Sequence, residues 1–484
     1  MAKKSVAKNY IFNLSYQILI MIIPFITTPY LSRVLGAKNI GIYSYTLSIT
    51  MYFILFGSLG VAMYGQREIA YLQDKKEERT KAFYEILFMR FITLGFSLLL
   101  FYLSFCTHGN YKIYYMILIL EVIATSIDIS WFFQGMEEFK KTVLRNTVVK
   151  LISVVCIFIF VKSSDDLWKY FMIYVLSNVL GNLTLWIYLP KYTEKISFKE
   201  LKIFRHLKPT FWLFIPQVAT QIYTVLDKTM IGSIVKDKSE VGYYEQAQKI
   251  VKLLMTIATS LGTVMMPRIA HTYAKGNTKK LKEYMNKSFA FITILAFPLM
   301  FGISSIVSSF VPMFYGDGYE KVKILITIIS PIIVAIGLSN VVGTQYLLPT
   351  KQQTKYTISV TVGAIVNLIL NFLLIKEFKS IGASISTVFA ECIVTATQFY
   401  LVKDQIKIKD VFKISYKYII SSVIMFIVNI IIGNTIDNNY LSIIIQISVS
   451  MVVYFGLLIV MKDKFLNEII QIFKRKISKN VAKR

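Results

Sequence analysis

Long apolar runs separated by short polar stretches dominate the chain. Each run has about twenty residues, enough to cross the hydrocarbon core of a bilayer as an α-helix that rises about 1.5 Å per residue. The pattern predicts an all-α, polytopic membrane protein with fourteen transmembrane helices, at residues 10–31, 40–62, 82–106, 113–134, 142–162, 168–190, 209–233, 242–267, 288–311, 322–348, 354–375, 381–402, 411–433 and 439–461.

Composition agrees with this pattern. Hydrophobic residues make up 55% of the 484 positions and charged residues only 17%, whereas a soluble domain has about 25% charged residues. No connecting segment is longer than about twenty residues, which excludes an inserted soluble catalytic domain.

The net charge of +27 would suggest nucleic-acid binding in a soluble protein. Here, however, Lys and Arg alternate between connecting segments. With the N-terminus inside, cytoplasmic segments hold 38 of them and outward segments hold 11. This is the positive-inside pattern, so we expect a multi-pass protein of the cytoplasmic membrane with both termini in the cytoplasm and no nucleic-acid partner.

A weak internal repeat suggests how the spans are grouped. Residues 36–43 resemble residues 232–244, and residues 131–142 resemble residues 346–357. The repeat predicts two six-helix bundles of the same orientation, arranged in a V around a central cavity. The predicted regions are an N-terminal bundle at 1–190, a cytoplasmic amphipathic linker at 191–208, a C-terminal bundle at 209–402, two additional transmembrane helices at 403–461, and a basic amphipathic cytoplasmic tail at 462–484.

Five basic side chains fall inside predicted spans, where a charge costs on the order of 3 kcal/mol unless it is paired or used. They are candidates for binding an anionic substrate, together with Arg33 at the outer end of the first span. Lys249 and Lys252 share one helix face with Glu245, which predicts a polar stripe. The other reading is snorkelling, or pairing with nearby acids. The five are Arg90, Lys150, Lys228, Lys249 and Lys252.

Acidic side chains also fall inside the spans. A buried carboxyl group can load and release a proton, or bind Na⁺, so these residues are candidates for ion coupling. Glu121 and Asp128 are seven residues apart, which would place them on one helix face. Asp227 and Glu245 are also candidates, although each has a lysine nearby that it could simply neutralise.

No motif for catalysis or cofactor binding is found. The chain has no Walker-type phosphate loop, no His-Glu-x-x-His and no nucleophile elbow, and its three cysteines lie in apolar stretches without metal-binding spacing. We therefore expect a non-enzyme without a metal or cofactor. The alternative from another class is a membrane polysaccharide polymerase, which would need a larger outward segment.

Five segments resemble, in order and spacing, the Wzx-type polysaccharide-biosynthesis flippases of the multidrug/oligosaccharidyl-lipid/polysaccharide exporter superfamily. The resemblance covers nearly the whole chain. The segments are PYLSRVLG at 29–36, GIYS at 41–44, YGQREIA at 64–70, WFFQGME at 131–137 and DKTMIG at 227–232.

The resemblance implies a flippase that moves undecaprenyl-pyrophosphate-linked oligosaccharide units from the inner to the outer leaflet, for a capsule, O-antigen or related glycan. It also implies membrane lipids, a polysaccharide polymerase and assembly proteins as partners. Two alternatives lie in the same superfamily. A peptidoglycan-precursor flippase would carry an Arg-Asp pair in the first helix, which is uncharged here from Tyr10 to Leu31. A multidrug exporter of organic cations fits poorly with basic spans.

Overall fold

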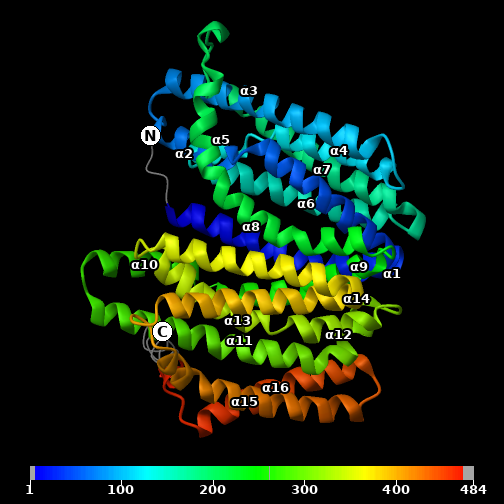
Figure 1. The fold of residues 1–484 in the computed structure, drawn as a ribbon, viewed down its shortest axis with the longest axis vertical. Helices are drawn as coiled ribbons and strands as arrows, with labels where there is room; N and C mark the ends of the chain where they lie inside the picture. Colours follow the sequence, from blue (N-terminus) through cyan, green and yellow to red (C-terminus); the bar gives the residue numbers. More distant parts are fainter. Residues whose placement is uncertain (1–5, 261, 472–484) are drawn as a thin grey trace, which may run out of the picture. The chain divides into compact units, whose positions relative to one another are not determined.

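The computed structural model describes residues 6–260 and 262–471, and these residues form helices and short connecting turns (Figure 1). The all-α prediction is confirmed. The chain divides into two compact units, at residues 1–242 and 243–484. The first contains α1 (Val6–Ser58), α2 (Val61–Tyr71), α3 (Lys76–Phe101), α4 (Lys112–Ser126), α5 (Ser130–Gly135), α6 (Phe139–Phe160), α7 (Leu167–Trp186) and α8 (Leu207–Ile234).

The helix α9 (Ser239–Thr259) begins at the end of the first unit and runs into the second. The remaining helices all lie in the second unit. They are α10 (Gly262–Ala274), α11 (Thr278–Tyr315), α12 (Glu320–Ile329), α13 (Ile332–Ser339), α14 (Gln353–Leu401), α15 (Ile408–Thr435) and α16 (Asn439–Val460).

Two very long helices each contain a sharp break. In α1 the break is at Gly36, whose φ of 73° is in a region that glycine adopts without steric cost. In α14 it is at Lys379, with a φ of 54°. Each break separates two predicted spans, 10–31 from 40–62 and 354–375 from 381–402, so the turn expected between them exists as a kink.

The other ten predicted spans also coincide with helical structure, but three of them are interrupted. The span 113–134 is split into α4 and α5, 242–267 into α9 and α10, and 322–348 into α12, α13 and a π-helical stretch at Asn340–Leu347. Among the described residues, nine helical stretches are long and apolar enough to cross a membrane. The count of fourteen crossings stays a prediction.

The core of the first unit gathers aromatic residues from segments that carry the family resemblance. Trp131, Phe132 and Phe133 of α5 are completely buried and contact Phe83 of α3 and Tyr64 of α2 within one cluster. Ring centroids of Phe83 and Trp131 are 5.6 Å apart. The WFFQG segment therefore fixes α2, α3 and α5 together, which is a packing role.

Two segments that the internal repeat pairs, the part of α1 after its kink and the start of α9, meet in the first unit. A Cβ atom at Gly41 would lie 1.7 Å from the main-chain oxygen of Lys238, and one at Gly242 would lie 2.0 Å from that of Ala37. The contact is reciprocal. Gly41 approaches the carbonyl of Lys238, four residues before Gly242, and Gly242 approaches the carbonyl of Ala37, four residues before Gly41. We call Ala37, Gly41, Lys238 and Gly242 the glycine joint. Lys238 is buried there and its ammonium group donates to the carbonyl of Val235 over 3.0 Å, near the end of α8.

In the second unit, α15 and α16 pack on α11. The Tyr454 hydroxyl of α16 donates to the main-chain oxygen of Ile294 over 2.7 Å, and Tyr418 of α15 donates to Asp463 over 3.2 Å. The first bond joins α16 to α11, and the second joins α15 to the segment that follows α16. Of the predicted basic tail, residues 472–484 lie outside the described residues.

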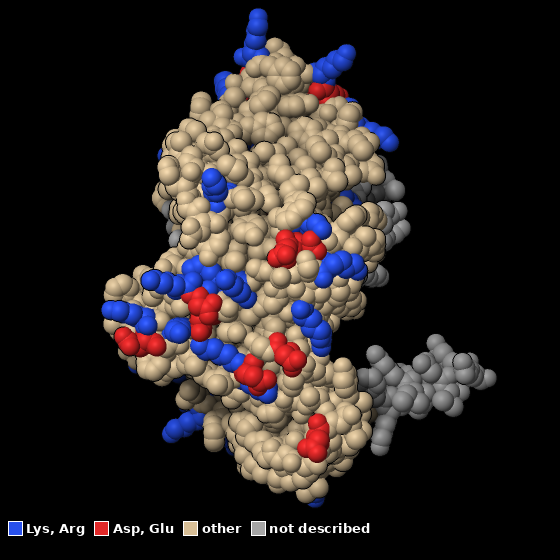
Figure 2. Space-filling view, turned by 90° about the vertical axis from the view of Figure 1, so that its right-hand side faces the viewer, with Lys and Arg blue, Asp and Glu red and all other residues tan. Residues whose placement is uncertain are grey.

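Much of the molecular surface is apolar. Most of the face in the space-filling view is uncharged, with acidic and basic side chains gathered in a few places (Figure 2). Large apolar side chains such as Phe96, Phe372 and Val452 are more than half exposed. A soluble monomer rarely exposes so much apolar surface. With the long apolar helices, this defines a multi-pass membrane protein.

The orientation in the membrane can be tested by single cysteine substitutions at exposed turns. Asp437 lies between α15 and α16, Gln405 between α14 and α15, and Lys280 in the first turn of α11. We expect a membrane-impermeant thiol reagent to label Asp437→Cys in intact cells, and to label Lys280→Cys and Gln405→Cys only after the membrane is opened. The reverse pattern at any position would contradict the predicted topology.

Candidate functional site

A buried carboxylate lies among three helices of the first unit. Glu121 of α4 is 7% exposed, and the Asn178 amide of α7 donates to both of its oxygens, over 3.0 and 2.9 Å. The ammonium group of Lys150 on α6 attracts it electrostatically. The sequence offered no local base for Glu121, because Lys150 is 29 residues away and approaches only through packing of α4, α6 and α7.

Aromatic side chains surround this carboxylate. The ring of Tyr43 on α1 lies 4.7 Å from Tyr170 and 5.7 Å from Tyr174, both on α7. Tyr174 also interacts with Glu121. Glu121 therefore lies in a largely apolar and aromatic environment within electrostatic reach of Lys150, and electrostatic interactions are strong in such an environment.

Glu121 does not share its helix face with Asp128. The helix α4 ends at Ser126, so Asp128 lies beyond it, and the expectation that Glu121 and Asp128 share a helix face is wrong. The Asp128 carboxylate instead accepts bonds from the main-chain nitrogen and hydroxyl of Ser130, over 2.9 and 3.0 Å, at the start of α5. Arg90, which is buried, donates to the Asp128 carbonyl over 2.6 Å. This arrangement stabilises the break between two helices.

Polar side chains also join α1 to α8. The Thr229 hydroxyl donates to Ser48 over 3.0 Å. Tyr52, one helical turn further along α1, lies beside Thr229 and within electrostatic reach of the buried Asp227. The buried Asp227 therefore lies near α1, and Lys228, the next residue along α8, is partly buried. Arg33, also a predicted binding residue, is exposed and donates to the Pro29 carbonyl over 2.8 Å within α1.

The helix α9 carries the predicted polar stripe. It is continuous from Ser239 to Thr259, so Glu245, Lys249 and Lys252 do lie on one face, and all three are partly buried. The neighbouring face of α9 forms hydrogen bonds with other residues of the second unit. Gln248 donates to the Tyr244 hydroxyl over 3.1 Å, and that hydroxyl lies 2.9 Å from Thr387 of α14.

The sequence did not predict a buried network that ties the linker to α3. The Glu85 carboxylate accepts bonds from the main-chain nitrogen of Lys202 (2.7 Å), from His206 Nε2 (2.8 Å) and from Arg205 (2.5 Å). His206 Nδ1 lies 2.7 Å from the Tyr64 hydroxyl of α2. Burial lowers the pKa of His206, which favours a neutral imidazole that donates from Nε2 and accepts at Nδ1.

Further bonds extend this attachment along the linker. Lys76 pairs with Glu194 over 3.2 Å and Lys81 with Glu200 over 2.7 Å. Arg79 donates to the Tyr192 carbonyl over 2.7 Å. Lys76, Arg79 and Lys81 in the first half of α3 therefore each contact a different residue of the linker. Basic and acidic residues alternate in the stretch of α3 that leads to Glu85. This is the feature of the sequence that could have indicated these contacts.

Removing the Glu85 carboxylate should destabilise the protein strongly. Glu85→Ala leaves the buried His206 and a main-chain N–H without their acceptor, which typically costs about 3 kcal/mol or more. The half-exposed Arg205 guanidinium loses the same partner at a smaller cost, because water can replace the carboxylate. We expect a clearly lower Tm in detergent, measured by light scattering. The exposed Glu78→Ala, whose pair with Lys75 is on the surface, should leave Tm nearly unchanged. Equal Tm values for the two variants would contradict this role.

Helices of membrane-spanning length, with polar and charged groups buried between them, define a multi-pass α-helical membrane protein. The structure of a protein described as "Lipid II flippase MurJ, inward closed conformation" superposes with a TM-score of 0.74 at 18% identity, over 94% of this chain and 99% of that one. The chain belongs to the polysaccharide biosynthesis protein family, whose profile matches residues 6–273. A profile of the MatE family matches residues 213–373.

Individual relatives agree with this membership. The "Putative O-antigen transporter" of Escherichia coli (strain K12) is 26% identical over 411 residues, which are 83% of this chain and 98% of that protein. The "Lipid II flippase MurJ" of Bacillus subtilis (strain 168) is 28% identical over 143 residues, 29% of this chain and 26% of that protein. The resemblance seen in the five sequence segments is confirmed at the level of the family.

Proposed function

We propose that this protein is a flippase that moves undecaprenyl-pyrophosphate-linked oligosaccharide units from the inner to the outer leaflet of the cytoplasmic membrane. The observation that carries the proposal is the similarity to the O-antigen transporter, which spans 98% of that protein and most of this chain. The product would be a capsule, an O-antigen or a related surface glycan. In this proposal the chain is a transporter and catalyses no covalent step.

Basic side chains inside the helices support a pyrophosphate-bearing substrate. Lys228, Lys249 and Lys252 are partly buried in helices, at depths where a cation is costly unless an anion compensates it. A pyrophosphate accepts charge-assisted hydrogen bonds, which are about twice as strong as neutral ones. Arg90 donates to the Asp128 carbonyl and Lys150 lies within electrostatic reach of Glu121, so we assign them a supporting role behind the three lysines.

Alternating access is the proposed mechanism. The oligosaccharide head would be exposed to one side of the membrane and then to the other, while the polyprenyl tail remains in the bilayer. The chain contains no nucleotide-binding motif. We therefore propose that an ion gradient, or the substrate gradient itself, drives transport.

Deletion of the gene in its native background tests the proposal. Loss of one surface glycan, with accumulation of its lipid-linked precursor on the inner leaflet, is the expected result. Restoration by a plasmid copy is the control. Normal surface glycan in the deletion strain would contradict the function proposed. Accumulation of the peptidoglycan precursor instead would identify the alternative flippase, to which the MurJ relatives point.

Glu121 is the strongest candidate for coupling to H⁺ or Na⁺, because it is buried and ionisable, accepts bonds from the Asn178 amide and lies within electrostatic reach of Lys150. Glu121→Gln keeps an oxygen for Asn178 but cannot ionise. We expect substrate flipping in proteoliposomes to lose its response to an imposed pH or Na⁺ gradient. Asp128→Asn, at a helix start, should keep that response. A normal gradient response in Glu121→Gln would remove this residue from the coupling mechanism.

A further inference from the structure

The linker at residues 191–208 presents a strongly basic surface. It contains six Lys or Arg side chains and two acidic ones. Both acidic side chains, Glu194 and Glu200, are paired with lysines of α3. Of the basic side chains, only Arg205 forms an ion pair with a described residue. The other five are exposed, and no acidic partner is found for them in the part of the chain that the structure describes. They are Lys191, Lys195, Lys199, Lys202 and Lys208.

Two phenylalanines of the linker are exposed among these lysines. Phe198 is 62% exposed and Phe204 is 67% exposed. The Phe198 ring meets the rings of Tyr84 and Phe88 on α3, with centroids 5.6 and 5.9 Å away, and the rest of its surface is uncovered. Large exposed apolar side chains are unfavourable in water. Between lysines, they are typical of a segment that lies on a bilayer surface, where the rings enter the head-group layer.

The length of α3 indicates the depth at which the linker lies. The helical stretch Lys76–Cys106 has 31 residues. It rises about 46 Å, which is about 16 Å more than the hydrocarbon core of a bilayer. Six of its seven acidic or basic side chains lie between Lys76 and Glu85, so the surplus length is at this end, in the head-group layer and the adjoining water. Because the linker contacts α3 from Lys76 to Phe88, it lies beside that layer.

The direction of the linker agrees with this depth. In Figure 1 it is the green segment at the top of the picture, which projects beyond α3 and across the direction of that helix. A segment directed along the helices would leave the membrane, whereas one that projects sideways lies over the surrounding lipid. Exposed aromatic side chains continue into the first turns of α8, where Phe211 is 49% and Trp212 65% exposed. Tryptophan is enriched at the membrane–water interface.

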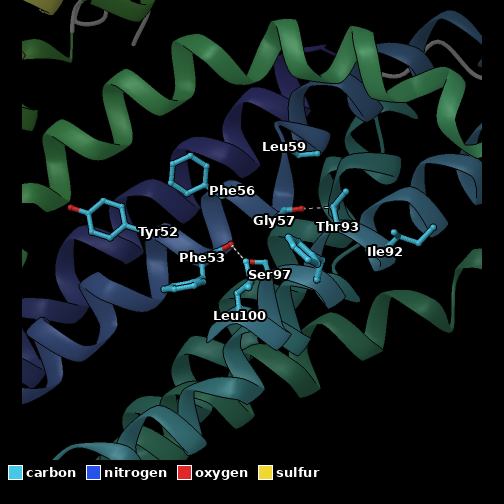
Figure 3. Close-up of a pocket in the computed structure, with 10 residues that line it drawn as sticks. Tyr52, Phe53, Phe56, Gly57, Leu59, Ile92, Thr93, Ser97 and Leu100 are labelled. Carbon is cyan, nitrogen blue, oxygen red and sulfur yellow. Dashed lines mark hydrogen bonds between the residues drawn. The ribbon is translucent and has the colours of Figure 1, made fainter. Parts of the chain in front are cut away.

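Charge and apolarity together identify the partner. A bilayer with anionic head groups offers negative charge and an apolar interior at one surface, which an acidic protein in solution does not. The groove of about 610 Å³ between α1 and α3 has only one of the two features (Figure 3). No charged side chain is among the residues that line it, and its Thr93 and Ser97 hydroxyls donate to main-chain oxygens over 2.6 Å. That groove therefore provides a control surface.

We propose that the linker lies on the bilayer surface and binds anionic phospholipids there through its five exposed lysines, with Phe198 and Phe204 inserted among the head groups. In the predicted topology this surface is the cytoplasmic leaflet. The bonds to Glu85, and those of Glu194 and Glu200, hold the linker on α3 at the same time. Since the linker leads directly into α8, the lipid surface and α3 together fix where α8 begins. The inference does not depend on which substrate the protein moves.

The test is photolabelling of the purified full chain in phosphatidylcholine nanodiscs that contain a small fraction of phosphatidylglycerol with a photoreactive head group. Within the first unit, we expect the labelled peptides to come mainly from residues 191–208. Unlabelled phosphatidylglycerol should compete about tenfold better than unlabelled phosphatidylcholine, or more, and soluble glycerol phosphate should not compete. Equal competition by the two phospholipids, or label spread evenly over the exposed parts of the first unit, would overturn the proposal.

Lysine substitutions test the contribution of charge. The linker variant combines Lys195→Gln, Lys199→Gln and Lys202→Gln. It should lower labelling about 100-fold, because each basic side chain near an anionic bilayer strengthens binding about fivefold. The matched control removes three exposed lysines from other parts of the first unit, with Lys112→Gln, Lys162→Gln and Lys236→Gln. The control should keep the labelling of the wild type. Wild-type labelling in the linker variant, or an equal loss in the control, would contradict the assignment.

An aromatic substitution tests the contribution of the rings. Phe204→Ala should lower labelling, whereas Phe96→Ala, in the groove of Figure 3, should not, although the two rings are similarly exposed, at 67% and 64%. An equal effect of the two would remove the rings from the proposal.

Thermal unfolding provides a second measurement. In phosphatidylcholine alone, the linker variant and the wild type should have the same Tm, because the substituted lysines are exposed and have no acidic partner among the described residues. Added phosphatidylglycerol should raise the Tm of the wild type and of the lysine control, but not that of the linker variant, because a ligand stabilises only a protein that binds it. A rise of the same size in all three would show that the lipid acts elsewhere and would overturn the proposal.

Discussion

Lys249→Ala and Lys252→Ala should abolish glycan export while the protein is still made and inserted. Both lysines lie on the polar face of α9 and are partly buried there. A charged hydrogen bond is worth about 1.5–3 kcal/mol, so the loss of one should weaken binding of a pyrophosphate about 10- to 150-fold. The measurement is surface glycan by immunoblot, normalised to the amount of protein in the membrane.

The matched controls are Lys38→Ala and Lys112→Ala. These lysines are exposed and lie in segments predicted to face outward, so their removal should leave export close to that of the wild type. Lys228→Ala, on α8, tests the third lysine that we propose to bind the pyrophosphate. Normal export by the variants at 228, 249 and 252 would mean that these charges are structural and that the head group binds elsewhere.

Gly41→Ala should be the most damaging small substitution outside the binding residues. The new methyl group would lie 1.7 Å from the Lys238 carbonyl oxygen, which is a main-chain atom and cannot rotate away. Overpacking of this kind usually costs about 1–3 kcal/mol or more. We expect a lower Tm, and loss of export if closing of the glycine joint is one step of alternating access.

Gly242→Ala should produce the same defect, because the joint is reciprocal and its methyl group would lie 2.0 Å from the Ala37 oxygen. The matched control is Gly95→Ala in α3, where a Cβ atom would meet nothing within 4 Å. That change should keep or slightly raise Tm, since alanine favours a helix interior by up to about 1 kcal/mol. Wild-type Tm and export in Gly41→Ala would show that the joint is not tightly closed.

Hydropathy predicted the helices well because membrane-spanning length is set by the bilayer and not by the neighbours of a helix. All fourteen predicted spans coincide with helical structure. The break at residues 330–331 lies at Pro331, a residue type that allows a helix to bend. The break at residues 127–129 was not foreseen, although Ser126, Asp128 and Ser130 make that stretch less apolar than the rest of the span. A turn between residues 375 and 381 was predicted, but not that Lys379 itself would take a positive φ, because a positive φ at lysine is held only by its surroundings.

Buried charges were found from the sequence, but their partners were not. Membrane physics singled out Arg90, Glu121 and Lys150, because any charge within an apolar run is conspicuous. Which groups meet depends on helix rotation and packing. Glu121 contacts Asn178, which is 57 residues away, and Arg90 binds the carbonyl of a residue whose side chain caps the next helix.

The sequence by itself determined that this protein is helical, lies in the membrane and belongs to the polysaccharide biosynthesis family, because these properties depend on composition, periodicity and short segments. The tertiary structure decided that Glu85 and His206 hold the linker on α3, that Gly41 faces the Lys238 carbonyl, and that Phe198 of the linker lies beside Phe88. Those contacts join residues far apart in the chain, and only the packing of whole helices brings them together.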